Sequence, residues 1–320
     1  MLSRNRTSKD SGVTRASALA ALAAVALPVH VRAQVPPLRI GAATTDTYGE
    51  PWFAQDIGAF ERRNLAVEIT AFSNGSQIVE AISANAIDVG LADVLQTAWA
   101  VLRGLPLTFF AGGSAYNTDA PTTVLCVAAN SAVQSGRDLE GQTVGCFSLG
   151  AIAQLAPEDW IHATGGDSTK VKFVEISATA MVAAIQRGTV AAGMVGEPFI
   201  SANRDNIKII AKPYDYIAKH FYIAAWCARS TWLKQNADTV RRFTSAVYET
   251  ARWLNTHHSE SAPTLARITK MDSDRIKTMT RATYSTALDV KLMQPVLDIA
   301  FRYKAIDRNV SASELVASLS

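Results

Sequence analysis

Short apolar runs alternate with longer segments of helical periodicity along most of the chain. The runs at residues 38–42, 67–72, 87–92 and 107–111 have the length and composition of buried strands. A helical pattern follows each of the first three, and the helix after the first strand begins near Pro51, a residue favoured in the first turn. Strands that alternate with helices in this way predict an α/β fold with mainly parallel strands.

The alternation is interrupted near Pro121. The strand-like run at 122–128 leads into a Ser/Gly/Asp-rich segment instead of a helix, and strands and helices alternate again from 141–146 to 207–211. Beyond Ser230 the pattern is helical. We therefore predict two α/β lobes: residues 34–121 and 222–320 form lobe I, and residues 122–221 form lobe II. Two chain crossings between them form a hinge and leave a cleft for a ligand.

The first 33 residues have the organisation of a cleaved export signal. A basic stretch precedes an apolar run at 16–29, and Val31-Arg32-Ala33 places small residues at the two positions that a signal peptidase recognises. The run is shorter than the ~20 apolar residues that a membrane-spanning helix needs. We expect cleavage after Ala33 and export to the periplasm.

Removal of this signal changes the charge of the protein. The chain has 31 basic and 28 acidic residues, and five of the basic ones but only Asp10 of the acidic ones lie in residues 1–33. The mature chain therefore carries 26 basic and 27 acidic side chains, a net charge of about −1. This balance, without a basic tract, argues against a nucleic-acid-binding protein.

The cysteines predict neither a metal site nor a disulfide framework. Cys126, Cys146 and Cys227 are the only three, and all lie in apolar, strand-like runs. An odd number leaves at least one thiol unpaired, and cysteine in such runs acts as a small buried hydrophobic residue. No spacing of His, Cys and carboxylate residues resembles a metal site. We therefore expect structural cysteines and no cofactor.

Several short motifs follow one another in a characteristic order. They are residues 40–52, Gly58-Ala59-Phe60-Glu61, Ser73-Asn74-Gly75-Ser76, Ile87-Asp88-Val89-Gly90, Gly104-Leu105-Pro106, Asp138-Leu139-Glu140-Gly141 and Gly196-Glu197-Pro198-Phe199. In this order the chain resembles the sulfonate/nitrate/taurine group of ABC-transporter substrate-binding proteins, a group related to the thiamine-precursor-binding and thiamine-pyrimidine-synthesis-like proteins. The resemblance implies a periplasmic binding protein type II fold. It also implies a monomer that delivers a small solute to an ABC permease in the inner membrane.

Candidate ligand-binding residues lie where strands are expected to end, because ligands of open α/β sheets bind outside the carboxyl ends of the strands. Thr45, Asp46 and Tyr48 follow the first strand, and Trp52 comes shortly after them. The alternative interpretation is that this loop only caps the helix at Pro51. The remaining candidates are Asn74, Gly75, Ser76, Asp93, Tyr116, Ser148, Gly150 and Glu197.

These remaining candidates offer three kinds of interaction. The segments 73–76 and 148–150 open helices on the two lobes, where backbone N–H groups bind polar or anionic groups. Tyr116, together with Phe147 and Trp226, would add aromatic walls, although core packing explains each nearly as well. Glu197 belongs to a motif that the resemblance places at the cleft, and the alternative is a turn near the hinge.

Asp93 departs from the resembled group, in which small hydroxyl or glycine residues are common at this junction of strand and helix. Its carboxylate either caps the following helix or faces the cleft, where it would repel an anion and favour an N–H donor. Asp46 and Glu197 also lie at expected strand ends, and no lysine or arginine occupies these loops. We predict a zwitterionic or neutral ligand with at least one N–H or ammonium donor.

Three alternative functions are compatible with the same fold. A thiamine-precursor (pyrimidine) binding protein would differ in its ligand, and a ligand-sensing subunit would differ in its partner. A cysteine-dependent enzyme would need an activated thiolate, and no histidine lies close in sequence to Cys146 to activate it. We therefore predict a binding protein and not an enzyme.

Overall fold

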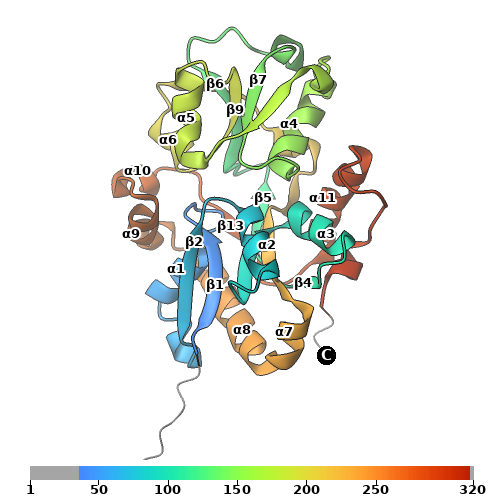
Figure 1. The fold of residues 1–320 in the computed structure, drawn as a ribbon. Coiled ribbons are helices and arrows are strands. Elements are labelled where there is room, and N and C mark those ends of the chain that lie inside the picture. The colour runs from blue at the N-terminus through green and yellow to red at the C-terminus, as the bar shows by residue number, and fades with distance from the viewer. Residues whose placement is uncertain (1–35, 318–320) are drawn as a thin grey trace, which may run out of the picture. The chain divides into compact units, whose positions relative to one another are not determined.

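The computed structural model describes residues 36–317, so the export signal expected at 1–33 lies outside the described residues. Two five-stranded sheets with helices packed on them divide these residues into two lobes (Figure 1). The predicted α/β fold class is thereby confirmed.

Lobe I is built on a sheet with the strand order β2-β1-β3-β12-β4. The long helix α8 buries one face, which includes Val240, Phe243, Val247 and Leu254. The elements are β1 (Leu38–Ala43), α1 (Glu50–Asp56), η1 (Glu61–Arg63), β2 (Val67–Phe72), α2 (Gly75–Ser83), β3 (Val89–Asp93), α3 (Val94–Leu102), β4 (Leu107–Gly112), β12 (Ala224–Arg229), α7 (Ser230–Gln235), α8 (Ala237–Leu254), α9 (His258–Thr269), α10 (Ser273–Lys277), α11 (Val290–Arg302) and η5 (Ala312–Leu315).

Lobe II is built on a sheet with the strand order β10-β6-β9-β7-β8. The elements are β6 (Thr123–Ala128), η2 (Gly136–Leu139), β7 (Thr143–Cys146), α4 (Ile152–Ala163), η3 (Ser168–Lys170), β8 (Lys172–Glu175), α5 (Ala178–Gln186), β9 (Ala192–Gly196), α6 (Phe199–Ala202), β10 (Ile207–Ala211) and η4 (Pro213–Tyr216). Strand β8 therefore lies in a different sheet from β1, as the predicted two-lobed fold requires.

One strand in each large sheet runs against its neighbours. In lobe I it is β12, which is antiparallel to β3 and β4, and in lobe II it is β6, which is antiparallel to β9 and β10. Each of these strands is the first after the chain enters that lobe. Strands β6 and β12 therefore begin near the space between the lobes, whereas the parallel strands β1, β3, β7 and β9 end there.

A third, three-stranded sheet lies between the lobes, in the order β11-β5-β13. Its strands are β5 (Ser114–Asn117), β11 (His220–Tyr222) and β13 (Thr283–Tyr284). The sequence did not predict this sheet, because strands of two to four residues are too short to show a hydrophobic period. The lobe boundaries at residues 121 and 222 stay a prediction, since the chain passes between the lobes through this sheet.

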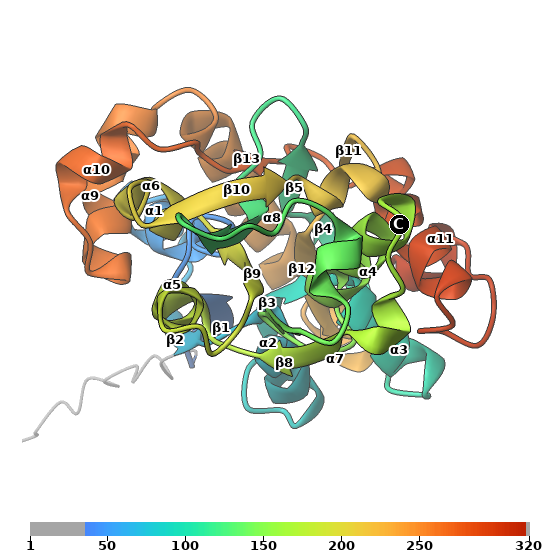
Figure 2. The ribbon, with the colours of Figure 1, turned by 90° about the horizontal axis from the view of Figure 1, so that it is seen from above.

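Helices on opposite flanks also connect the lobes (Figure 2). On one flank, Arg275 of α10 donates a hydrogen bond from Nη1 to the carbonyl of Ala202, at the end of α6, at 3.0 Å. On the other, the hydroxyl of Tyr303, just after α11, donates to Oδ1 of Asp159 in α4 at 2.6 Å. The two lobes are thus held together on both sides of the three-stranded sheet.

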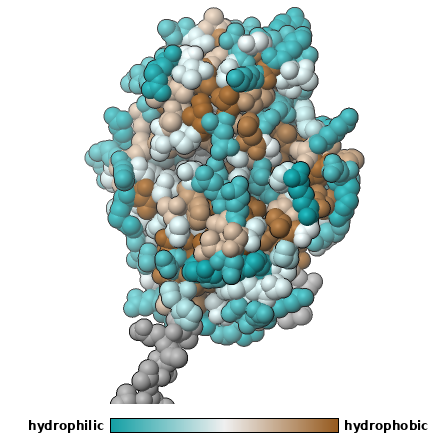
Figure 3. Space-filling model, in the orientation of Figure 1, coloured by the Kyte–Doolittle hydropathy of each residue, from teal (hydrophilic) through white to brown (hydrophobic). Residues whose placement is uncertain are grey.

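The surface is mixed in character. Figure 3 shows hydrophilic side chains over most of one face, with small groups of apolar side chains between them. Within residues 36–317, no helix combines the length and the apolar character needed to cross a bilayer. Scattered apolar surface of this kind is normal for a folded domain.

Candidate functional site

A cavity with an empty volume of about 690 Å³, part of which is open to solvent, lies between the lobes. Eight of the residues predicted to bind a ligand line it: Thr45, Tyr48, Asn74, Gly75, Ser76, Asp93, Ser148 and Glu197. They follow β1, β2, β7 and β9 or end β3, in agreement with the rule for the carboxyl ends of strands. Their contact with a ligand stays a prediction.

Two candidates from the first loop lie away from the cavity lining. The Asp46 side chain is buried and pairs with Arg281, with 2.9 Å between its Oδ1 and Nη2 of the arginine. Trp52 lies within α1 and is 9% exposed, as part of the core. The loop prediction located the turn correctly but could not tell which side chains face inward, because that depends on partners far away in sequence.

Tyr116 and Gly150 also lie outside the lining. Tyr116 belongs to β5, where its ring packs against Tyr214 and its hydroxyl donates to Asp215 Oδ1 at 2.8 Å. Gly150 is exposed, with φ of 69°, and its N–H donates to the Gln154 side chain at 2.8 Å. Its role is to turn the chain into α4, since glycine adopts positive φ without strain.

Asp93 both caps a helix and lines the cavity, so the two roles considered for it, helix cap and cleft residue, are compatible. It is the N-cap of α3, and its Oδ1 accepts a hydrogen bond from Gln96 N at 2.9 Å. Burial raises the pKa of the Asp93 carboxyl to about 6, against the opposing effect of the backbone N–H groups of Gln96 and Leu95. This carboxylate can therefore accept a hydrogen bond from a ligand near neutral pH.

Glu197 places a second carboxylate on the cavity, from lobe II. Burial raises the pKa of Glu197, and hydrogen bonds from the N–H and the hydroxyl of Ser201, at 3.0 and 2.8 Å, act in the opposite direction. The nearby Thr280 backbone of lobe I also acts to lower the pKa of Glu197. The two carboxylates thus approach the cavity from different lobes.

Aromatic side chains from both lobes complete the lining. Tyr48, Phe147, Phe199 and Tyr214 all border the cavity. Burial raises the pKa of Tyr48 and of Tyr214 well above the usual range, and the charge of Asp93 adds to both shifts. Flat, π-rich walls of this kind favour a planar or apolar part of a ligand.

Sequence reasoning missed several lining residues, among them Thr47, Ser73, Thr123, Phe199 and Tyr214. Thr47 and Ser73 lie within or beside predicted loops, so the strand-end rule could have included them. Thr123 lies at the start of the antiparallel strand β6, where that rule does not apply. Tyr214 lies in a short 3₁₀ helix, which no pattern in the sequence marks.

The electrostatic character of the lining is acidic. Among the described residues that line the cavity, none is lysine, arginine or histidine, and Asp93 and Glu197 carry the formal charges. The start of α4 supplies the complementary groups. Its N-cap, Ala151, makes no side-chain cap, and Ile152 and Ala153 of its first turn border the cavity. A ligand could therefore direct a donor to the carboxylates and an acceptor to these N–H groups.

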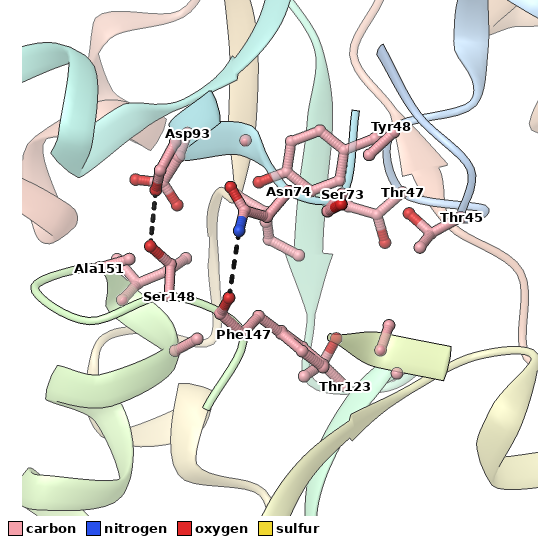
Figure 4. Close-up of a pocket in the computed structure, with 18 of the residues that line it drawn as sticks. Thr45, Thr47, Tyr48, Ser73, Asn74, Asp93, Thr123, Phe147, Ser148 and Ala151 are labelled. Atoms are coloured by element: carbon pink, nitrogen blue, oxygen red, sulfur yellow. Dashed lines mark hydrogen bonds between the residues drawn. The ribbon is translucent and has the colours of Figure 1, made fainter. Parts of the chain in front are cut away.

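Direct hydrogen bonds cross between the lobes beside the cavity (Figure 4). The Ser76 and Ser148 hydroxyl oxygens are 2.8 Å apart, and Asn74 donates from Nδ2 to the Phe147 carbonyl at 3.3 Å. Gln96 donates from Nε2 to the Leu149 carbonyl at 3.2 Å. The loops of the two lobes therefore touch, and this conformation is closed on that side of the cavity.

The match to a family model decides what this two-lobed chain is related to. The family described as NMT1/THI5 like matches residues 51–261, more than half of the chain. The chain belongs to the NMT1/THI5-like family. The resemblance drawn from the order of short motifs is thereby confirmed.

Among curated proteins, this NMT1/THI5-like chain is 31% identical over 94 residues to 4-amino-5-hydroxymethyl-2-methylpyrimidine phosphate synthase from Schizosaccharomyces pombe. The match covers 29% of this chain and 26% of that protein, so it spans about a quarter of the relative's length.

Solved structures share the fold over most of the chain. The periplasmic aliphatic sulphonate-binding protein SsuA from Escherichia coli superposes with a TM-score of 0.70 and 18% identity, over 89% of this chain and 93% of that one. The periplasmic nitrate-binding protein NrtA from Synechocystis PCC 6803 gives 0.77 and 14%, over 89% and 87%. The alkanesulfonate-binding protein SsuA from Xanthomonas axonopodis pv. citri, bound to MOPS, gives 0.74 and 18%, over 89% and 99%. These likenesses confirm the periplasmic binding protein fold.

The three cysteines of this NMT1/THI5-like protein are buried and unpaired. Burial raises the pKa of each thiol to about 12, so all three are protonated at neutral pH. Cys146 does not line the cavity, and its thiol contacts the carbonyl oxygen of Ser148 at 3.5 Å. The surroundings of these cysteines are those of packing residues and not of nucleophiles.

Proposed function

We propose that this protein is the periplasmic substrate-binding component of an ABC importer, and that its cavity captures a small polar solute with at least one N–H or ammonium donor. One observation carries the proposal. Two carboxylates, Asp93 and Glu197, line a cavity whose described lining contains no basic side chain. The fold shared with sulfonate- and nitrate-binding proteins supports the role in capture.

The lining disfavours a simple anion as the solute. An anion would gain hydrogen bonds at the start of α4 but would lie near two carboxylates, and like charges ~4 Å apart repel by several kcal/mol at intermediate dielectric. A donor-bearing solute avoids this conflict by placing an N–H group against Asp93 or Glu197. Its planar part can then pack between Tyr48 and Tyr214 of the lining.

A pyrimidine is the first solute to test. 4-Amino-5-hydroxymethyl-2-methylpyrimidine, which appears in the name of the curated relative, offers an amino donor, ring-nitrogen acceptors and a flat ring. A thiamine-precursor-binding protein is therefore the alternative that the partial match favours. Zwitterions such as taurine satisfy the same rule, with an ammonium group for the carboxylates and a sulfonate for the helix start.

The proposed partner and compartment depend on segments outside the cavity. The apolar run at 16–29 and the small residues at 31 and 33 support export. One fold neighbour, from Staphylococcus aureus, is named as the ligand-binding component of an ABC-type import system. A ligand-sensing subunit would share the cavity and differ only in its partner. Genes for a permease and an ATPase beside this one would favour import, and a sensor-kinase gene would favour sensing.

A thermal-shift screen of the mature chain tests the proposal. The panel contains pyrimidines, amino acids, taurine, plain alkanesulfonates, nitrate and aromatic acids. A solute that binds only the folded state stabilises it by RT ln(1 + L/Kd), where L is the free solute concentration, so at a fixed concentration a tighter solute raises the melting temperature further. We expect the largest shifts from donor-bearing compounds. Shifts confined to nitrate and plain sulfonates would defeat the donor rule, and the absence of any shift across the panel would argue against capture of small polar solutes.

A further inference from the structure

The loop between β1 and α1 presents neighbouring side chains to two different environments. Thr45, Thr47 and Tyr48 line the cavity (Figure 4). Asp46 lies among them in sequence, but its side chain is only 1% exposed and turns to Arg281. Its carboxylate accepts hydrogen bonds from Arg281 Nε at 3.0 Å and Nη2 at 2.9 Å, a two-pronged pairing that fixes both side chains.

The Arg281 side chain is itself held by further contacts. It is 4% exposed, and its Nη1 donates to the His258 carbonyl at 2.8 Å and to the Ser261 hydroxyl at 2.9 Å. The guanidinium carbon lies 5.9 Å from the centroid of the Phe53 ring. With Nε, Nη1 and Nη2 all hydrogen-bonded and one face near Phe53, this arginine has little freedom to adopt another rotamer.

The backbone of the same loop is tied to the same region. The Tyr284 hydroxyl donates to the Asp46 carbonyl, and Ala282 N donates to the Asp46 carboxylate at 2.6 Å. Tyr284 belongs to β13, which pairs with β5 in the three-stranded sheet between the lobes. The cavity loop is therefore anchored, by side chain and main chain, to a segment 235 residues further along.

That segment also contacts the opposite lobe. The backbone of Thr280, the residue before Arg281, lies near enough to the Glu197 carboxylate on the cavity to lower its pKa. One stretch of six residues, 279–284, thus supports the cavity from lobe I through Asp46 and from lobe II through Glu197.

We propose that Arg281 is a positioning residue of the ligand site, which acts through Asp46 to hold Thr45, Thr47 and Tyr48 along the cavity and does not touch the solute. The inference rests on the proposed function, because it assigns these three side chains a role in capture. Loss of Arg281 leaves the Asp46 carboxylate buried without its cation, so the loop must move to hydrate it. A site whose supporting side chains are loosened loses the geometry of the groups that they hold.

The test compares Arg281→Met with a matched control at the end of β1 that is remote from the cavity loop. Arg39, near the other end of β1, forms a second two-pronged pair, with Asp88, through Nε at 3.1 Å and Nη2 at 2.6 Å. Arg39→Met breaks that pair away from the cavity. The measurements are titration calorimetry with 4-amino-5-hydroxymethyl-2-methylpyrimidine and with taurine, and amide exchange of residues 44–49 in the protein without solute. Circular dichroism verifies that each variant is folded.

We expect Arg281→Met to weaken binding of whichever probe the wild type takes by about tenfold or more. We expect Arg39→Met to bind within about twofold of wild type, since neither Arg39 nor Asp88 borders the cavity. Arg281→Lys should fall between, because an ammonium group cannot replace the two parallel N–H bonds of a guanidinium. The double variant Asp46→Leu, Arg281→Met should regain stability, since neither charge is left buried, and should still bind weakly.

Two results overturn the inference. One is a folded Arg281→Met protein that binds like Arg39→Met, and the other is a double variant in which binding recovers together with stability. If the wild type binds neither probe, the proposed function fails and amide exchange decides the inference by itself. Faster exchange of residues 44–49 in Arg281→Met than in Arg39→Met then supports the positioning role, and equal exchange overturns it.

Discussion

The hydroxyl oxygen of Ser76 lies 2.8 Å from that of Ser148, so a helix start on lobe I and a loop on lobe II share a hydrogen bond across the cavity. Neither residue needs the other to fold its own lobe, because the two lie in different lobes. The bond therefore forms only when the lobes are closed, and it adds to the stability of the closed state.

Removal of either hydroxyl should weaken solute binding by favouring the open state. We expect Ser76→Ala and Ser148→Ala each to raise Kd by about twofold to tenfold, the equivalent of one hydrogen bond of ~0.5–1.5 kcal/mol. The double variant should have the same Kd as the single variants, since each single substitution already removes the same hydrogen bond. Ser83→Ala, whose hydroxyl bonds to Val79 within α2, is the control. Additive losses would show that the two serines act separately on the solute.

Asp93 should make binding of a donor-bearing solute depend on pH. Its pKa is raised to about 6, so the carboxylate is ionised above that pH and protonated below it. Since the ionised form accepts the solute's hydrogen bond, affinity should fall as the pH drops through 6, by up to about tenfold per pH unit. Asp93→Asn keeps the helix cap and should flatten the profile. Calorimetry from pH 5 to 7.5 measures both, and an unchanged slope in the variant would contradict the assignment.

Glu50 should make the protein less stable as the pH rises. It is 1% exposed, and burial raises its pKa to about 8 although Trp226 Nε1 donates to it at 2.8 Å. Between the unfolded pKa near 4.5 and the folded pKa, the folded state holds a proton that the unfolded state has released, so stability declines over this range and levels off above pH 8. Glu50→Gln can still accept the Trp226 bond.

Because Glu50→Gln removes the titrating group, it should raise the free energy of unfolding at pH 8 by about 1–3 kcal/mol. At pH 4.5 it should leave this free energy nearly unchanged. Urea unfolding at the two pH values measures the difference. Glu68→Gln, at an exposed position of β2, is the control and should change stability little at either pH. Destabilisation of Glu50→Gln at pH 8 would show that Glu50 is charged in the folded protein.

Cys146→Ala should leave solute affinity nearly intact. The thiol is buried, its pKa is raised to about 12, and it lies outside the cavity lining. The substitution removes one buried sulfur and should cost ~1–2 kcal/mol of stability through the small void left behind. Binding and unfolding measurements separate the two effects. A turnover of a bound pyrimidine that disappears in this variant would establish an enzyme.

Elements with a clear period could be predicted from the sequence, and the connection between the lobes could not. Helix α3 spans Val94–Leu102, as its apolar spacing predicts, and Asp93 before it is a recognisable cap. The sheet between the lobes escaped prediction because β13 has two residues, whose pairing with β5 depends on tertiary structure alone. Local patterns describe an element but not its partner across the fold.

The same distinction explains the candidate site. Thr45 and Tyr48 line the cavity as the strand-end rule suggests, but Asp46 between them does not, since Arg281 binds it from 235 residues away. Tyr214 reaches the cavity from a short 3₁₀ helix that the sequence does not mark. The positions of turns follow from local chemistry, whereas the direction of each side chain depends on long-range partners.

Titration calorimetry of the mature wild-type protein with matched solutes tests the central claim most directly. The set is 4-amino-5-hydroxymethyl-2-methylpyrimidine, taurine, ethanesulfonate and nitrate, each measured also on Asp93→Asn. Taurine and ethanesulfonate share a sulfonate and differ by the amino group, so their ratio isolates the donor. The proposal predicts that the pyrimidine or taurine binds at least about tenfold more tightly than ethanesulfonate and nitrate, and that Asp93→Asn narrows this gap. Tight binding of nitrate or ethanesulfonate by the wild type, with the donor-bearing solutes bound no better, would contradict it.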